Sequence, residues 1–314
     1  MISSKKCLVI ILLVFLCPMG ILGVLNYVVD PYNVNRQFEL GLSKEKISYR
    51  ANYRLYKMQA FANDPCENIL LGDSRMDGLD TGEIESRTGQ KYFNFAYGGG
   101  SAYEIVDTFW YAADLMSLKR VYIGMNFNLY NAANRSNLVT EAKRTSGKPL
   151  AYYFSLYTAK ISIYNLLYKY TGINMVSEKP PVEKDVFWKK QLGETTKGFY
   201  GRYIYPEDLY NELVKIHDYC LAHDIEMVLI IPPTHVDLQN KVADYALTEA
   251  YVKYKEDMNS LGKVYDFDID TEDNRNYDLY GDPYHAGKEI KENVIRVVWG
   301  ITAYNSLNTT GGMF

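Results

Sequence analysis

The stretch NILLGDSR, residues 68–75, is a short apolar run that stops at Gly72-Asp73-Ser74. Such a run, bounded by turn residues, is typical of a strand buried in a parallel sheet. The Gly-Asp-Ser predicts a tight turn into a helix, with the serine hydroxyl at the carboxyl end of the strand. Asp and Ser are also ordinary turn and helix-capping residues, so the motif alone leaves a purely structural role open.

Outward from this stretch, the chain alternates strand-like and helix-like segments. With 68–72, the predicted strands are short apolar runs at 92–97, 120–127, 225–233 and 263–269. Helices are predicted between or after them, at 80–88, 101–117, 206–223, 237–260 and 286–300. This alternation indicates an α/β domain with a mostly parallel five-stranded sheet. Residues 128–205 fit the alternation less well, and we interpret them as an insertion beside the active site.

An apolar stretch at 7–29 dominates the N-terminus. About 20 such residues cross the hydrocarbon core of a bilayer, whereas the apolar part of a signal peptide is shorter and precedes a small-residue cleavage site. No clear cleavage site follows here, and Leu16 before Cys17 makes a poor lipoprotein signal. We therefore predict a retained single-pass transmembrane anchor over 7–29.

The charges beside this stretch set its predicted orientation. Lys5 and Lys6 precede it, and positively charged flanks stay in the cytoplasm. The predicted layout is a cytoplasmic N-terminus (1–6), the anchor, a connecting region (30–66) and a catalytic domain (67–314). The predicted localisation is the cell membrane, with that domain outside the cytoplasm.

The composition favours one main domain and excludes a nucleic-acid-binding surface. With 314 residues, 47% hydrophobic and 23% charged, the chain can bury a sizeable core. Its net charge is −4 and it has no long Lys/Arg run, so it lacks the electrostatic footprint for nucleic acid. The 30 tyrosines suit a sugar or polymer surface, although compositional drift accounts for them equally well.

Two cysteines, Cys66 and Cys220, lie outside the apolar stretch. They are too few for a structural zinc site, and we predict neither a metal nor a cofactor. A disulfide between them is one interpretation, and two buried reduced thiols are the favoured one.

A serine hydroxyl needs a base to take its proton, and histidine serves best near neutral pH. His285 lies in YGDPYHAGKEI, residues 280–290, with Asp282 three residues before it. This spacing lets the carboxylate reach Nδ1 while Nε2 faces the serine. The alternative to this catalytic pair is a plain Asp-Pro turn that caps the following helix. His235, after the predicted strand 225–233, is the second candidate base.

The remaining histidines, His217 and His223, fall in or at the end of a predicted helix. A packing or surface role is favoured for both.

Gly-Asp-Ser early and Asp-x-x-His late resemble the SGNH, or GDSL-type, hydrolase superfamily over about residues 67–300. The resemblance implies a flavodoxin-like, three-layer α/β/α fold. It also implies a catalytic triad of Ser74, Asp282 and His285, with Ser74 as the nucleophile.

Two further blocks of that family supply the oxyanion hole, together with the Ser74 amide. The glycine block resembles NFAYGGGSAYE, residues 94–104, where Gly99 is the chosen donor and Gly98 and Gly100 are alternatives. The Gly-x-Asn block resembles YIGMNFN, which assigns the side-chain donor to Asn126. Asn128 competes for the same role.

Arg75 stands where secreted GDSL lipases usually have Leu or Ile, and no Asp adjoins Asn126. Together with the apolar stretch and the Asp30-Pro31-Tyr32 that follows it, these departures make the sequence more similar to the membrane-tethered branch of the superfamily. That branch includes relatives of the teichoic acid D-alanyl transfer protein and polysaccharide O-acetyltransferases.

This similarity implies a serine esterase or O-acyltransferase that acts on acyl esters, acetyl esters in the first place, of a cell-surface glycan or polyol polymer. It also implies a multi-spanning membrane-bound O-acyltransferase as a partner. A non-catalytic glycan-binding or scaffold partner of such a complex is the alternative.

Overall fold

The computed structural model of the protein describes residues 4–176 and 180–300; in the first helix, side chains are described at 14 and from 16 onward. The chain divides into two compact units. The N-terminal unit comprises 1–65 and 138–180, and the sheet unit comprises 66–137 and 181–314. Residues 138–180, predicted to be part of an insertion in the catalytic domain, therefore cluster with the predicted anchor and connecting region.

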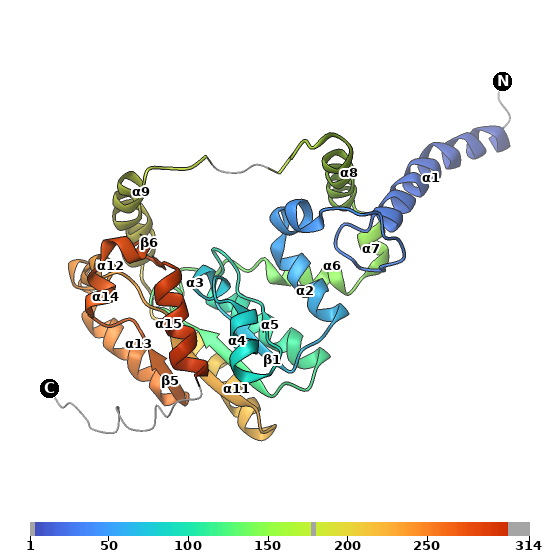
Figure 1. Cartoon of the computed structure of the whole chain (residues 1–314). Helices are drawn as coiled ribbons and strands as arrows, with labels where there is room; N and C mark the ends of the chain where they lie inside the picture. Colours follow the sequence, from blue (N-terminus) through green and yellow to red (C-terminus); the bar gives the residue numbers. More distant parts are fainter. Residues whose placement is uncertain (1–3, 177–179, 301–314) are drawn as a thin grey trace. The chain divides into compact units, whose positions relative to one another are not determined.

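A five-stranded sheet forms the centre of the sheet unit (Figure 1). Its strands pair in the order β2-β1-β3-β4-β5, and every pairing is parallel. This order is that of flavodoxin-like folds, so the predicted parallel sheet is confirmed. The strands are β1 (Asn68–Leu71), β2 (Phe93–Asn94), β3 (Arg120–Gly124), β4 (Glu226–Ile231) and β5 (Lys263–Asp266).

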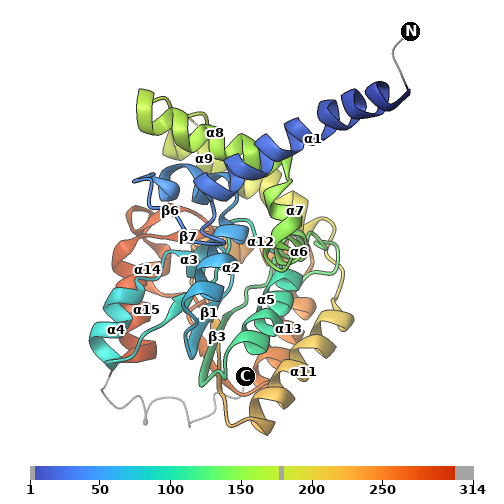
Figure 2. The same ribbon diagram turned by 90° about the vertical axis from the view of Figure 1, so that its right-hand side faces the viewer.

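Helices cover both faces of this sheet, which confirms the three layers. Figure 2 shows α4 (Thr81–Thr88) and α15 (Lys288–Trp299) on one side of the strands. On that side Leu70, Tyr122 and Val228 form a buried core with residues of both helices, including Trp299. The other side carries α5 (Ala102–Leu115), α11 (Glu207–Ala222) and α13 (Thr248–Ser260).

The single helix predicted over 237–260 is wrong in one respect, because the structure has two helices there. Helix α12 (Val236–Asp244) ends before α13 begins at Thr248. Ala246 between them has φ +55°, a left-handed conformation that interrupts a right-handed helix.

The predicted loop before the last helix contains a short hairpin. Strands β6 (Tyr280–Asp282) and β7 (His285–Ala286) pair antiparallel, and Asp282 lies opposite His285. The segment before it includes α14 (Glu272–Arg275) and the 3₁₀ helix η3 (Tyr277–Leu279).

Residues 184–200 of the predicted insertion form three short helical segments within the sheet unit. Trp188 packs into a small core with Tyr280, Ala286 and Ile290, so this segment lies against the hairpin. The segments are α9 (Lys184–Lys190), the π-helix η2 (Gln191–Thr195) and α10 (Thr196–Tyr200).

The described part of the N-terminal unit is helical. Its buried Asp30 accepts hydrogen bonds from the backbone amides of Val34, Asn35 and Arg36 and from the hydroxyl of Tyr152. The elements are α1 (Ser4–Val29), the π-helix η1 (Glu45–Tyr49), α2 (Tyr53–Asn63), α6 (Val139–Ser146), α7 (Pro149–Tyr153) and α8 (Leu156–Thr171).

The predicted anchor over 7–29 falls within α1. Among the described residues, no helix is long and apolar enough to cross a membrane. Asn26, near the end of the predicted span, is fully buried, and its Nδ2 donates to the carbonyls of Tyr153 and Ser155. That end of the helix is thus held by polar contacts with other parts of the N-terminal unit.

Candidate active site

Ser74 is the first residue of α3 (Ser74–Asp77), directly after the turn that ends β1. The turn is tight because Gly72 has φ +154°, and a Cβ there would lie 2.5 Å from Met76 Cγ. A Cβ on Gly124, at the end of β3, would likewise lie 2.6 Å from Met76 Sδ. Two glycines therefore let α3 pack closely onto the carboxyl edge of the sheet, where the sequence predicted the serine.

The hairpin brings His285 and Asp282 to the same place. The Nε2 of His285 lies 2.7 Å from Ser74 Oγ, and its Nδ1 lies 2.7 Å from Asp282 Oδ2. The other carboxylate oxygen of Asp282 accepts the backbone N–H of Tyr284 at 2.8 Å. Asp282 is buried, whereas the side chain of His285 is 36% exposed.

This arrangement sets the direction of proton transfer. An ionised carboxylate only accepts, so Nδ1 of His285 carries the proton and Nε2 is left to accept from Ser74. A serine so placed can be deprotonated as it attacks an acyl carbon, and Asp282 stabilises the imidazolium that results. The structure thus brings together all three residues of the predicted triad.

A buried ion pair lies behind the serine. The Arg75 guanidinium contacts the Asp73 carboxylate through Nε at 3.1 Å and Nη2 at 2.7 Å. The same Nη2 donates to the Oδ1 atoms of Asn126 at 2.5 Å and Asn128 at 2.8 Å. Within the described part of the chain, Nη1 of Arg75 is buried without a hydrogen-bond partner.

The charge states of this pair are mutually stabilised. Burial acts to raise the pKa of Asp73, but the charge and hydrogen bonds of Arg75 outweigh it and hold that pKa below its usual value. Burial acts to lower the pKa of Arg75, and Asp73 more than compensates, so the pKa of Arg75 is raised. Both groups are therefore charged at neutral pH.

The glycine block supplies one candidate oxyanion donor. Gly99 and Gly100 both line the cavity beside Ser74. The amide of Gly100 donates to the carbonyl of Tyr97 at 2.9 Å, whereas no described residue accepts the amide of Gly99, which has φ +64°. This geometry favours Gly99 over its alternative Gly100, and Gly98 does not line the cavity.

The Asn block differs from the prediction. Asn126 does not line the cavity, and its Nδ2 points to the Asp73 carboxylate at 3.4 Å. Asn128, the competing residue, lines the cavity. Because a guanidinium only donates, its bond to Asn128 Oδ1 turns Nδ2 of that amide away from Arg75. No described residue accepts from this Nδ2, so the geometry favours Asn128, the alternative to Asn126, as the candidate side-chain donor.

The cavity at Ser74 has a volume of about 290 Å³, near the lower end for ligand pockets. Part of its wall comes from the predicted insertion, through Gln191, Thr195 and Phe199. Tyr284, in the hairpin turn, also lines it and bonds its hydroxyl to Thr196 Oγ1 at 2.9 Å. The sequence located this segment beside the site but did not single out these residues, since no motif marks them.

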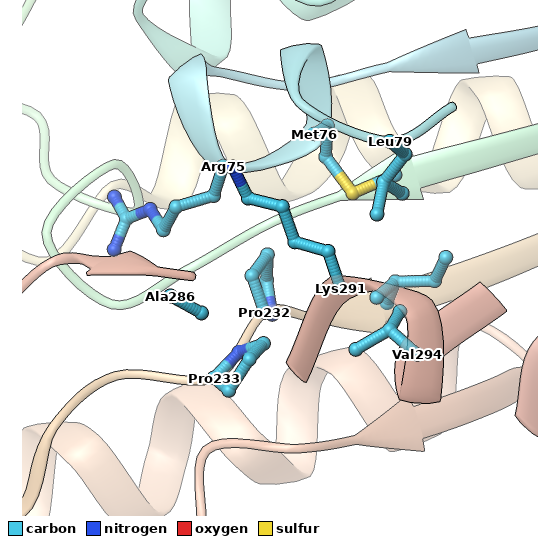
Figure 3. Close-up of a pocket in the computed structure, with 9 residues that line it drawn as sticks. Arg75, Met76, Leu79, Pro232, Pro233, Ala286, Lys291 and Val294 are labelled. Atoms are coloured by element: carbon cyan, nitrogen blue, oxygen red, sulfur yellow. The ribbon is translucent and has the colours of Figure 1, made fainter. Parts of the chain in front are cut away.

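A second pocket lies on the far side of Arg75 and is too small for a substrate. Figure 3 shows Met76, Leu79 and Pro232 around it, with the guanidinium of Arg75 pointing away. Its volume is about 20 Å³, room for about one water molecule. Ser74 and His285 do not line it, so the chemistry belongs to the larger cavity.

The alternative base, His235, is a structural residue. It is 4% exposed, its Nδ1 accepts the amide of Asp237, and its Nε2 lies 3.2 Å from the carbonyl of Arg275. His217 and His223 bond to neighbouring residues of their own segment, as the sequence favoured.

The two cysteines of the sheet unit are both buried. Cys220 is a free thiol whose pKa burial raises to about 12, and Sγ of Cys66 donates to the carbonyl of Lys91.

Comparisons with known proteins add little to this geometry. No family model matches the sequence. No curated protein matches it either. Among solved structures, the chain is similar to a candidate acylhydrolase from Bacteroides fragilis, with 13% identity and a TM-score of 0.36 over 79% of this chain and 98% of the other.

Two further solved structures show a likeness of the same size. One is a candidate platelet activating factor from Streptococcus pneumoniae, with 9% identity, a TM-score of 0.42, and coverage of 80% of this chain and 91% of the other. The second is a GDSL-like lipase from Bacteroides thetaiotaomicron, with 12% identity, a TM-score of 0.37, and coverage of 79% and 96%. Likenesses this weak decide nothing about the reaction.

Proposed function

We propose that the protein is a serine esterase of the SGNH type that forms an acyl-enzyme on Ser74. One observation carries this proposal: the two successive 2.7 Å contacts from Ser74 through His285 to Asp282, at the wall of a cavity. A hydroxyl, an imidazole and a buried carboxylate in this order form an activated nucleophile.

In the acylation step, Ser74 Oγ forms a bond to the carbonyl carbon of an ester while its proton moves to Nε2 of His285. The carbonyl oxygen becomes an oxyanion, held by the amides of Ser74 and Gly99 and by Nδ2 of Asn128. The tetrahedral intermediate then loses the alcohol, which takes the proton back from His285. The acyl group remains on Ser74.

In the second step, a hydroxyl compound gives its proton to His285 and attacks the acyl-serine. Collapse releases the new ester or acid and returns the proton to Ser74 Oγ. If the attacking group is water, the reaction is hydrolysis, and if it is a glycan hydroxyl, the reaction is acyl transfer. A cavity of about 290 Å³ has room for an acyl group such as acetyl together with part of the acceptor.

We propose further that the acceptor is a cell-surface glycan or polyol polymer, with acyl groups supplied through a multi-spanning O-acyltransferase. The support is Arg75 after the serine and the apolar stretch at 7–29, which together resemble the membrane-tethered branch. The same stretch supports a position at the cell membrane with the sheet unit outside. Fractionation of cells that express the full chain, with protease added outside, tests this location.

The first test of the esterase proposal is the Ser74→Ala variant, with Ser86→Ala as a control because Ser86 is exposed on α4. We expect a fluorophosphonate probe to label the wild type and Ser86→Ala but not Ser74→Ala. Hydrolysis of p-nitrophenyl acetate should follow the same pattern and should decline as the acyl chain lengthens. An unlabelled wild type would favour the scaffold alternative, and full turnover by Ser74→Ala would refute the proposal.

A further inference from the structure

Helix α8 of the N-terminal unit buries polar side chains and exposes large apolar ones. Three of its inward positions are polar: Thr158, Ser162 and Asn165 are each at most 1% exposed, next to the buried Ala159 and Ile161. A helix packed in water turns its apolar stripe inward and its polar stripe outward, whereas α8 buries these three polar side chains and exposes several large apolar ones. The outward positions, three or four residues apart, are Leu156, Lys160, Ile163, Leu167 and Tyr170.

The described part of α1 shows the same pattern. Asn26 is fully buried, and its Oδ1 accepts from Ser162 Oγ on α8 at 3.0 Å. Its Nδ2 is satisfied by the carbonyls of Tyr153 and Ser155 at 2.7 and 3.0 Å. The exposed large side chains of α1 include Leu16, Met19, Ile21, Val24 and Tyr27.

The outward surface is continuous from α1 to α8. The two helices line one open groove of about 560 Å³, to which Ile21 and Leu25 contribute from α1 and Leu156 and Ile163 from α8. Ile21 is 71% exposed and Leu156 78% exposed. Soluble monomers rarely expose a contiguous apolar surface of more than a few hundred Å². An exposed apolar surface shared by two helices suits an apolar neighbour.

The charges of the surface indicate what that neighbour is. The sequences of α1, α7 and α8 contain no Asp or Glu. Lys160 lies in the exposed stripe, with Nζ 5.5 Å from the centre of the Tyr164 ring. A lysine and tyrosines on an otherwise apolar face suit the headgroup region of an anionic membrane, where lysine extends its ammonium toward the phosphates.

We propose that the outward face of α8, together with the adjoining face of α1, lies in the interfacial layer of an anionic lipid bilayer. Leu156, Ile163 and Leu167 then enter the acyl-chain boundary while Lys160 reaches the headgroups. The inward Asn26–Ser162 hydrogen bond links the two helices on the side away from the lipid. This goes beyond the anchor at 7–29, because α8 is a second contact that the apolar stretch does not predict.

The test uses the full chain in vesicles of phosphatidylglycerol and phosphatidylcholine that contain an apolar, carbene-generating photoprobe. After irradiation, labelled residues are mapped by proteolysis and mass spectrometry. We expect labels on α8 at Leu156, Ile163 and Leu167. The internal controls are Leu221 on α11 and Val252 on α13, which are 68% and 51% exposed and should stay unlabelled.

A variant separates membrane contact from folding. Ile163→Glu combined with Leu167→Glu should abolish labelling of α8, while the urea unfolding midpoint stays that of the wild type, since both side chains are exposed. The matched control is Leu221→Glu, which should leave α8 labelling unchanged.

Three outcomes overturn the proposal. One is labelling of α1 without α8, which still leaves the anchor standing. Another is a cross-link between Lys160 residues of two copies without photolabel on α8, which makes a second copy the occupant. The last is equal labelling of Leu221 and α8. None of these outcomes bears on Ser74, so the esterase proposal is tested separately.

Discussion

Replacing Asn128 separates the two candidate oxyanion donors. Asn128→Ala removes an Nδ2 donor from a residue that lines the cavity, whereas Asn126→Ala changes a residue that does not line it. Loss of one oxyanion donor lowers kcat by about 10²- to 10³-fold, or about 3 to 4 kcal/mol of transition-state stabilisation. We expect this loss for Asn128→Ala with KM nearly unchanged, because the bond forms mainly in the transition state.

Asn126→Ala should act on stability instead. It removes the oxygen that accepts Arg75 Nη2 at 2.5 Å in a buried cluster, a loss of about 1 to 3 kcal/mol in unfolding free energy. Its kcat should fall by less than about tenfold, below the range of a lost oxyanion donor. Asn128→Asp is the shape-matched control: it keeps an oxygen for Arg75 but has no N–H to donate, so its kcat should fall at least as far as that of Asn128→Ala.

The assay is p-nitrophenyl acetate hydrolysis over a range of substrate concentrations, with urea unfolding of each variant. The reasoning is refuted if Asn126→Ala loses about 10²-fold in kcat while Asn128→Ala stays within about threefold of the wild type. That result would return the donor role to Asn126, as the resemblance first implied.

Further predictions concern the triad and the elements behind it. Asp282→Asn should lower kcat by about 10⁴-fold, because an amide favours the wrong imidazole tautomer. A loss below tenfold in a normally folded variant would contradict the proposed role of Asp282 in orienting His285. Gly124→Ala should cost about 1 to 3 kcal/mol of stability and reduce activity, because the new Cβ meets Met76; an unfolding midpoint equal to that of the wild type would argue against this contact. Asp73 has a lowered pKa in the folded state, so its charge stabilises the fold above the unfolded pKa of about 4 and this contribution is lost as the pH falls through the folded pKa. Urea unfolding should therefore show the difference between wild type and Asp73→Asn to be largest near pH 7 and to shrink at lower pH; a difference that grows in acid would contradict the assignment.

Much of the sheet unit was predictable because its signals are local. A buried parallel strand is a short apolar run, and each of the five predicted runs contains an observed strand. The Ser74 turn was predictable for the same reason, since Gly72 permits a backbone that other residues avoid. Asp282 and His285 are three residues apart, so their contact depends on one hairpin.

The N-terminal unit was less predictable. Sequence hydrophobicity marks 7–29 as apolar, but it does not show that Asn26 is buried against residues more than 120 positions away. Nor does it show that α8 faces outward with its apolar side, because a helical stripe has the same spacing whether it lies inside or outside.

By itself, the sequence determined the parallel sheet, the serine at its carboxyl edge and the Asp-His pair, since each depends on residues close together in the chain. Only the tertiary structure decided which asparagine faces the cavity. Asn126 and Asn128 both reach Arg75, and the choice between them depends on how the donor-only guanidinium, held by Asp73, orients the two amides. That arrangement joins residues that follow β1 to residues that follow β3. These residues are about 50 positions apart in the chain, so no local sequence pattern predicts their contact.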